Sequence, residues 1–233
     1  MYNLKKKLVI FSGAGVSAES GLKTFRDSGG LWEEFRIEDV ATPEAWAANP
    51  ALVTEFYNLR RKQVMEAQPN DAHKLLADLE SRYDITIITQ NIDDLHERAG
   101  SKKVLHLHGE IMKVRSSMYP ELIYPIDKWE IKIGEMCERG SQLRPHIVWF
   151  GEMVPEMDNA ISIAAEADLF VVIGTSLNVY PAAGILNYVK PSAQKWLIDP
   201  GDFNLDYVIN LKHIKKVASE GMKVLASELN KKL

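Results

Sequence analysis

The feature that most constrains the fold of this chain is a set of short, uninterrupted apolar runs, separated by longer segments with helical patterns. The apolar runs are residues 8–11 (LVIF), 85–88 (ITII), 169–173 (LFVVI) and 196–198 (WLI). Runs of this kind are typical of strands buried on both faces of a parallel sheet. The segments with helical patterns are residues 50–65, 71–79, 157–167 and 214–229. This alternation predicts an α/β fold, in which a mainly parallel sheet has helices on both faces.

Each apolar run is followed by a cluster of small or polar residues. These clusters are residues 12–15 (SGAG), 89–91 (TQN), 174–176 (GTS) and 199–201 (DPG). Ligands of open α/β sheets bind beyond the carboxyl ends of the strands, so we expect the functional site among these clusters.

Two stretches interrupt the alternation and predict a smaller, inserted, helix-rich domain. Residues 30–69 are helix-rich, and residues 112–144 are irregular, with Pro120, Pro125 and mixed charge. We therefore expect a sheet domain made of residues 1–30, 70–111 and 145–233, and a small domain made of residues 31–69 and 112–144.

Composition excludes several classes of partner. The net charge is −4 and no long basic run is present, so we expect no nucleic-acid partner. No window approaches the roughly 20 apolar residues of a membrane span, so we expect no membrane partner. The chain has one cysteine, Cys137, which excludes an intrachain disulfide. The default expectations are a cytoplasmic location and a monomer.

A glycine-rich loop follows the first expected strand. Residues 13–18 (GAGVSA) fit the pattern G-x-G-x-x-G/A of a Rossmann-like dinucleotide site. In that pattern Gly13 permits a tight turn, Gly15 lets the backbone approach a pyrophosphate, and Ala18 lets the next helix pack closely. Taken alone, the pattern also fits a simple turn between a strand and a helix. Residues 19–27 are too polar for a long helix, and predict a short helix followed by a loop that could fold over a cofactor.

Five motifs follow one another along the chain: residues 13–26 (GAGVSAESGLKTFR), 89–100 (TQNIDDLHERAG), 106–110 (HLHGE), 144–152 (RPHIVWFGE) and 174–184 (GTSLNVYPAAG). In this order they resemble the motifs of the sirtuin family of NAD-dependent protein deacylases. The resemblance extends from about residue 8 to residue 184. It implies that the sheet domain is a Rossmann-like NAD-binding domain, that the substrate is an acyl-lysine protein or peptide, and that the products are nicotinamide and O-acyl-ADP-ribose.

Three histidines compete for the catalytic role. His96 is expected within a helix, facing solvent or capping a neighbour. His106 lies in an apolar strand run, and His108 comes at the end of that strand, where a side chain can enter a cleft. A histidine can take up a proton at neutral pH, and the resemblance implies that His108 deprotonates a ribose hydroxyl. By the same resemblance, Asn91 would position the ribose or a water, and Asp93 would bind the nicotinamide carboxamide, although both residues also suit turn formation and helix capping.

The resemblance also implies the binding residues. The cofactor would be bound by Gly13, Ala14, Gly15, Ser17, Thr24, Phe25, Arg26, Gln90, Asn91, Ile92, Asp93, Gly174, Thr175, Ser176 and Asp199. The substrate would be bound by Val148, Phe150 and Gly151, where extended backbone could pair with a peptide strand, although these apolar residues also suit core packing.

A further pair points to the acyl group. Tyr57 and Arg60 are three residues apart on an expected helix, so both can face one side. A phenol and a guanidinium can together bind a carboxylate. The spacing resembles the Tyr-x-x-Arg pattern of the sirtuin branch, class III, that removes succinyl and malonyl groups. The alternative is a solvated basic helix face, which also contains Arg61 and Lys62.

The family's structural zinc site is expected to be missing. Sirtuins usually have two Cys-x-x-Cys pairs between the His-Gly and Phe-Gly-Glu motifs, and a structural zinc needs about four ligands. Here Ser116 stands near the first expected cysteine and only Cys137 remains. We therefore expect no zinc, in a chain of bacterial type.

Three other functions remain open at this point. The same scaffold could support an NAD-dependent ADP-ribosyltransferase or a non-catalytic NAD or ADP-ribose sensor. The glycine loop alone would also suit a dehydrogenase, but no Tyr-x-x-x-Lys pair follows it in a suitable place.

Overall fold

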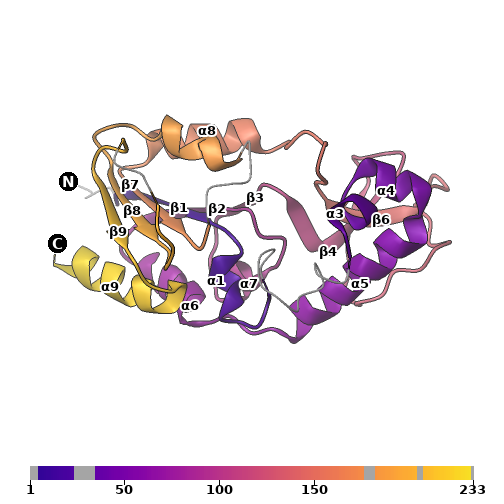
Figure 1. Ribbon diagram of the computed structural model, residues 1–233, viewed down its shortest axis with the longest axis horizontal. Helices are drawn as coiled ribbons and strands as arrows, with labels where there is room; N and C mark the ends of the chain where they lie inside the picture. Colours follow the sequence, from indigo (N-terminus) through magenta and orange to yellow (C-terminus); the bar gives the residue numbers. More distant parts are fainter. Residues whose placement is uncertain (1–4, 24–34, 176–181, 204–206, 232–233) are drawn as a thin grey trace.

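The computed structural model describes residues 5–23, 35–175, 182–203 and 207–231. Thr24, Phe25, Arg26 and Ser176 lie outside the described residues. Figure 1 shows two domains side by side, with both chain termini on the larger one.

The larger domain is built on a six-stranded sheet in which every paired neighbour is parallel. The strand order is β3-β2-β1-β7-β8-β9. The strands are β3 (Val104–His106), β2 (Asp84–Thr89), β1 (Lys7–Ser12), β7 (Leu169–Ile173), β8 (Gln194–Ile198) and β9 (Leu211–Ile214). The order reverses direction between β1 and β7, which is where a ligand is expected in a doubly wound sheet. The α/β prediction, with a parallel sheet and helices around it, is confirmed.

Helices cover both faces of this sheet because successive strand residues point to opposite sides. On one face, Leu8, Ile10 and Val171 pack with α6 (Asp71–Leu79), α9 (Ala218–Asn230) and the single turn α1 (Gly15–Ala18). On the other face, Phe11 and Val172 pack with α8 (Met157–Glu166) and the 3₁₀ helix η1 (Ala182–Tyr188).

One predicted helix boundary is wrong. Residues 214–229 were expected to be helical throughout, but Ile214 is the last residue of β9 and the helix begins at Ala218. The preceding strand sequence LKHI has two exposed residues at its centre, so it lacks the uninterrupted apolar run that identified the other strands.

The smaller domain combines helices with a second sheet. Its helices are α3 (Ile37–Val40), α4 (Pro43–Ala48) and α5 (Pro50–Glu66). Its strands are β5 (Ile123–Pro125), β4 (Gly109–Ser116) and β6 (Leu143–Ile147), paired antiparallel in the order β5-β4-β6. Thr42 and Asn49 each cap the following helix through a side-chain oxygen, and a proline occupies the next position of both helices, where its missing N–H costs nothing.

The expected boundaries near residues 111 and 145 fall inside β4 and β6. The residues at which one domain ends and the other begins therefore remain a proposal. The single-turn helix α7 (Leu95–Arg98) lies where the two domains meet, since Leu95 packs with α5 and β6 in the third apolar cluster of the molecule.

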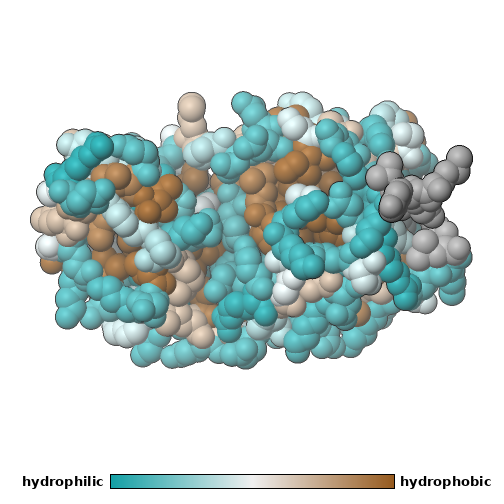
Figure 2. Space-filling model, turned by 180° about the vertical axis from the view of Figure 1, so that it is seen from behind, coloured by the Kyte–Doolittle hydropathy of each residue, from teal (hydrophilic) through white to brown (hydrophobic). Residues whose placement is uncertain are grey.

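Seen from behind in Figure 2, hydrophobic side chains gather in two areas, one on each domain, within largely hydrophilic surroundings. Within the described ranges, no helix is both long and apolar enough to cross a membrane.

Candidate active site

Two glycine loops interlock at the point where the strand order reverses. The amide of Gly15 donates to the carbonyl of Gly174 at 2.8 Å. A Cβ on Gly15 would lie 2.8 Å from the Cα of Gly174, and a Cβ on Gly13 would lie 2.6 Å from the Cβ of Thr175. Gly174 itself has a φ of +61°, which favours glycine. The glycines of the first loop are therefore needed for contact with the second loop, a reason that the motif alone did not reveal.

A buried polar chain joins α1 to the loop after β2. The Ser17 hydroxyl donates to Asp93 Oδ2 at 3.0 Å and accepts from Asn91 Nδ2 at 3.1 Å. The backbone amide of Leu95 donates to Asp93 Oδ1 at 3.2 Å. Burial raises the pKa of Asp93, although these two donors oppose that shift. Three residues predicted from the motifs are thus brought together in one network.

One ring nitrogen of His108 is in a hydrogen bond, and the other has no hydrogen-bond partner recorded among the described residues. Its Nδ1 lies 3.0 Å from the carbonyl oxygen of Gln90, which can only accept, so Nδ1 carries the proton. In the neutral imidazole, Nε2 is then the unprotonated nitrogen. Burial lowers the pKa of His108, and the Gln90 carbonyl partly offsets this effect. The side chain is therefore a neutral base at pH 7.

His106 is in a different state, because acceptors face both of its ring nitrogens. Nδ1 lies 2.9 Å from the Asn91 carbonyl oxygen and Nε2 lies 2.8 Å from Glu97 Oε1. Burial opposes a charge on His106, but Glu97 and the Asn91 carbonyl outweigh it and raise its pKa. This residue suits a structural cation better than a base.

The expectation that His96 faces solvent or caps a neighbour is wrong. His96 is fully buried, and its Nε2 lies 3.0 Å from the Ser12 hydroxyl. The short helix that contains it is covered by α6, whose His73 contacts the His96 ring. The sequence patterns also assign no role to Ser12 or Thr89, although Ser12 donates to Thr89 Oγ1 at 2.9 Å beside the site.

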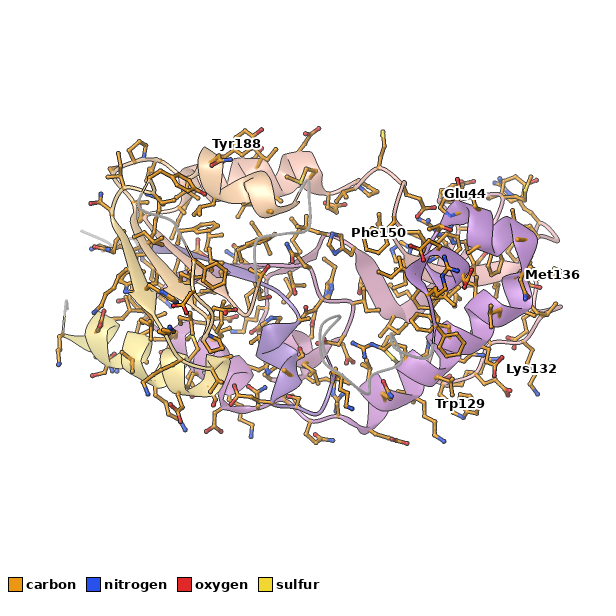
Figure 3. The ribbon with its side chains drawn as sticks, viewed as in Figure 1. Glu44, Trp129, Lys132, Met136, Phe150 and Tyr188 are labelled. Carbon is orange, nitrogen blue, oxygen red and sulfur yellow. The ribbon has the colours of Figure 1, made fainter. Side chains whose placement is uncertain are left out.

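The segment after β6 runs beside the His108 loop. The amide of Val148 donates to the carbonyl of His108 at 3.0 Å, and the amide of Phe150 donates to Ala41 at 3.0 Å. Phe150 is 46% exposed and lies between the two domains in Figure 3. Gly151 is exposed and has a φ of +88°, which favours glycine at this turn. Val148, Phe150 and Gly151 therefore lie on one segment next to His108, in which Val148 is half-buried and the turn at Phe150 and Gly151 is exposed.

Glu152 holds this turn in place. Its carboxylate accepts from Arg144 at 2.9 and 3.2 Å, from Arg115 at 3.2 Å, and from the amide of Trp149 at 2.8 Å. Burial raises the pKa of Glu152, but its cationic partners and the amide outweigh burial and lower it overall. Arg115 comes from β4, far from the motif in sequence, and no pattern singled it out.

Tyr57 and Arg60 lie on the same helix and within electrostatic reach of one another. Tyr57 is 3% exposed, and burial raises the pKa of its hydroxyl, which stays protonated. Arg60 is half-buried and donates to the carbonyl of Lys23 at 3.2 Å. Burial lowers the pKa of Arg60, and the negative charge of Asp93 opposes that shift, so Arg60 lies within electrostatic reach of the polar chain described above. The Tyr57 hydroxyl lies instead within reach of Arg144 and Glu152.

The remaining predicted positions lie at strand ends. Gln90 Oε1 accepts from the Thr175 hydroxyl at 3.2 Å, which bridges the loops after β2 and β7. Ile92 and Ala14 are half-buried. Asp199 follows β8 and accepts from the amide of Gly201 at 2.8 Å.

The residues near the expected zinc position form a hydroxyl and thiol cluster. Ser116 Oγ lies 2.5 Å from Ser141 Oγ, which lies 3.2 Å from Cys137 Sγ. One thiol and two hydroxyls do not fit a tetrahedral zinc site, which uses thiolate, imidazole or carboxylate ligands. In the part of the chain that the structure describes, no three His, Cys, Asp or Glu side chains are placed to hold a metal ion.

The fold and the site define a Rossmann-like protein with its site at the strand-order reversal and a half-buried neutral histidine beside an exposed turn. The family model "Sir2 family" matches residues 13–181. This chain belongs to the Sir2 family.

Close relatives agree over nearly the full length. A protein of Bacteroides thetaiotaomicron named "NAD-dependent protein deacylase" is 52% identical over 225 residues, which are 94% of this chain and 96% of that protein. A protein of Helicobacter pylori with the same name is 51% identical over 224 residues, which are 96% of this chain and 97% of that one. A solved Sir2 homologue in complex with ADP-ribose superposes with a TM-score of 0.89 at 39% identity, covering 98% of this chain and 93% of that one.

Proposed function

We propose that this protein removes acyl groups from lysine side chains of proteins, consuming NAD and producing nicotinamide and O-acyl-ADP-ribose. It is an NAD-dependent protein deacylase by its family and by the shared name of relatives that match nearly its whole length. The observation that carries the proposal is the state of His108, a half-buried neutral imidazole with its Nε2 left to accept a proton.

The residues present fit NAD. Gln90 Nε2 is buried and has no hydrogen-bond partner among the described residues, so a donor is available for a ligand oxygen. The same Gln90 side chain accepts a hydrogen bond from Thr175 through its oxygen. Both residues lie at the strand ends where a dinucleotide binds in this fold. Gly13, Ala14, Gly15 and Ser17 would contact the cofactor from the first loop, and Gly174 and Asp199 from the later strands. NAD, when bound, supplies the ribose carbon to which the acyl oxygen is transferred as nicotinamide leaves.

The protein's own groups would then act as follows. His108 Nε2 takes the proton of a ribose hydroxyl, and the carbonyl of Gln90 stabilises the resulting imidazolium through Nδ1–H. Asp93 offers carboxylate oxygens to the carboxamide of nicotinamide, and Ser17 fixes its orientation. Asn91, oriented by the same hydroxyl, positions the ribose or a water.

The segment of residues 148–151 would bind the peptide. Its backbone is held against His108 on one side and by the Glu152 ion pairs on the other. Pairing of a peptide strand with this backbone would bring the acyl-lysine to the histidine.

Tyr57 and Arg60 would select acidic acyl groups, which makes succinyl-lysine and malonyl-lysine substrates in addition to acetyl-lysine. A guanidinium and a protonated phenol are both donors, and a carboxylate accepts from both. This choice of acyl group is supported by the closeness of the two side chains, since each lies within electrostatic reach of the other.

The test of the activity is nicotinamide release from NAD with matched acetyl-lysine and succinyl-lysine peptides. We expect release that depends on the peptide and is lost in His108→Ala. Release without any peptide dependence would favour an ADP-ribosyltransferase, and binding of ADP-ribose without release would favour a sensor.

The test of the acyl preference compares two charge-removing changes on α5. In Arg60→Met we expect the ratio of succinyl to acetyl kcat/KM to fall by about tenfold to a hundredfold, the loss of a charge-assisted hydrogen bond. Lys62→Met is the matched control, because Lys62 is exposed and its ammonium lies over the Trp129 ring. An unchanged ratio in Arg60→Met would reject the carboxylate role.

A further inference from the structure

Two histidines that the proposed chemistry does not use are buried side by side behind the site. His73 on α6 and His96 on α7 are both fully buried, and their ring centroids are 4.9 Å apart at an interplanar angle of 61°. Each ring has one nitrogen in a hydrogen bond. The other nitrogens, His73 Nε2 and His96 Nδ1, are buried and have no partner among the described residues.

The protonation of His73 follows from its partner. The backbone amide of Asn70 donates to His73 Nδ1 at 3.3 Å, in the capping box that begins α6. Because a backbone amide can only donate, Nδ1 is unprotonated and the neutral ring carries its proton on Nε2. The unpartnered nitrogen of His73 is therefore a donor.

The protonation of His96 follows in the same way. The Ser12 hydroxyl gives its single proton to Thr89 Oγ1 at 2.9 Å. Its oxygen can then only accept from His96 Nε2, which lies 3.0 Å away. His96 therefore also carries its proton on Nε2, and its unpartnered nitrogen Nδ1 is an acceptor.

The two unpartnered atoms are thus one donor and one acceptor on neighbouring rings. We propose that His73 Nε2–H donates to His96 Nδ1, and that His96 is a positioning residue for the loop after β2, which contains Gln90 and Asn91. Leaving both atoms unpaired in the interior would be unfavourable. Ring centroids 4.9 Å apart place the two rings close enough for a bond between their edge nitrogens.

This series of hydrogen bonds, here called the relay, runs from His73 through His96 and Ser12 to Thr89. It ends on the segment that carries the site. Thr89 Oγ1 accepts from Ser12 and also from the amide of Asn91 at 3.0 Å. Gln90, which lies between Thr89 and Asn91 in the sequence, provides the carbonyl that fixes the tautomer of His108. A continuous set of hydrogen bonds, which begins at the amide of Asn70 and ends at the amide of Asn91, would therefore fix the positions of Asn91 and His108 relative to each other.

The relay requires both histidines to be neutral, and their surroundings agree. Burial lowers the pKa of His73 to about 4, although Glu97 opposes this. Burial also lowers the pKa of His96, and positive charge on His73 or His106 would lower it further.

The first test is long-range proton–nitrogen NMR of the free protein labelled at histidine. We expect both rings to show the Nε2–H tautomer without change between about pH 5.5 and about pH 8.5. A proton on Nδ1 of either ring, or titration near the ordinary histidine pKa, would overturn the proposal. This measurement needs no cofactor and does not depend on the proposed function.

The second test pairs two substitutions at one position. His96→Gln keeps an N–H donor where Nε2 stands, whereas His96→Leu fills the space without one. We expect His96→Leu to lower kcat about tenfold with little change in KM, and His96→Gln to recover most of that loss.

Equal kcat in His96→Leu and the unmodified protein would reject the positioning role. If His96→Leu does not fold, the NMR result decides. An unmodified protein without peptide-dependent nicotinamide release would instead contradict the proposed function on which the kinetic test rests.

Discussion

At the scale of single residues, three histidines close in sequence have different pKa shifts because their ring nitrogens have different partners and surroundings. His96 donates to a hydroxyl, His106 meets acceptors on both sides, and His108 has one nitrogen bound and one available. The same residue type therefore has a lowered pKa at His96 and His108 and a raised pKa at His106.

The pH dependence of catalysis should report His108. Because burial lowers its pKa, the neutral base persists below the ordinary histidine value of about 6.5. We expect kcat/KM to be flat near neutrality and to fall on acidification with a midpoint below that value. The measurement is kcat/KM for an acetyl-lysine peptide against pH, and a midpoint above the ordinary value would contradict the assignment.

The motif resemblance selected His108 and placed it at a strand end, where the structure has it. It could not give the state of His96, because burial of that ring depends on α6, which contacts it from outside the motif. Arg115 was missed for the same reason, since its partner Glu152 is 37 residues away in sequence.

At the scale of elements, neighbouring residues of α5 make different contacts. Arg60 lies within electrostatic reach of Asp93. Asn58 and Arg61 instead bind the backbone of the small domain. Arg61 is fully buried and donates to the carbonyls of Ile111 and Trp129, both at 2.8 Å, and to Asn58 Oδ1 at 2.8 Å. Burial lowers the pKa of Arg61 to about 10, so it remains charged at neutral pH.

Removing this guanidinium should weaken the small domain. In Arg61→Met the three acceptors lose their donor, and we expect a loss of about 2–4 kcal/mol in the free energy of unfolding. Urea unfolding followed by tryptophan fluorescence measures it. Lys62→Met on the exposed side should change stability by less than about 0.5 kcal/mol, and a similar small effect in Arg61→Met would show that these hydrogen bonds are not needed.

The sequence predicted elements best where the apolar pattern was strong. Strands β1, β2, β7 and β8 were found from uninterrupted apolar runs, because each is buried on both faces of the sheet. The antiparallel sheet within residues 109–147 was not found, since β5 contains a proline and has two exposed residues of three. Pairing between β4 and β6 depends on contacts across more than twenty residues, which a local pattern does not encode.

At the scale of the whole molecule, buried neutral histidines link stability to pH. His73 has a pKa of about 4 in the folded protein, and an ordinary value of about 6.5 is expected in the unfolded chain. Between these values the unfolded chain binds more protons, so stability falls as the pH falls. His106, whose pKa is raised, contributes in the opposite sense near neutrality.

The contribution of His73 can be isolated by substitution. Its shift corresponds to roughly 3 kcal/mol, present above about pH 6.5 and lost progressively down to about pH 4. In His73→Asn, which keeps an acceptor for the amide of Asn70, we expect a shallower fall in stability on acidification. Urea unfolding at neutral and acidic pH measures this, and parallel curves for the two proteins would contradict it.

The close contact of Gly15 with Gly174 has a consequence for how the molecule opens. The amide of Gly15 is bonded to the carbonyl of Gly174, and the amide of Gly13 is bonded to the carbonyl of Ile173. Neither amide can meet solvent while the loops remain in contact, so both should exchange their hydrogen for deuterium in the same event. The two glycine loops, more than 150 residues apart in sequence, would then behave as a single cooperative unit of local unfolding.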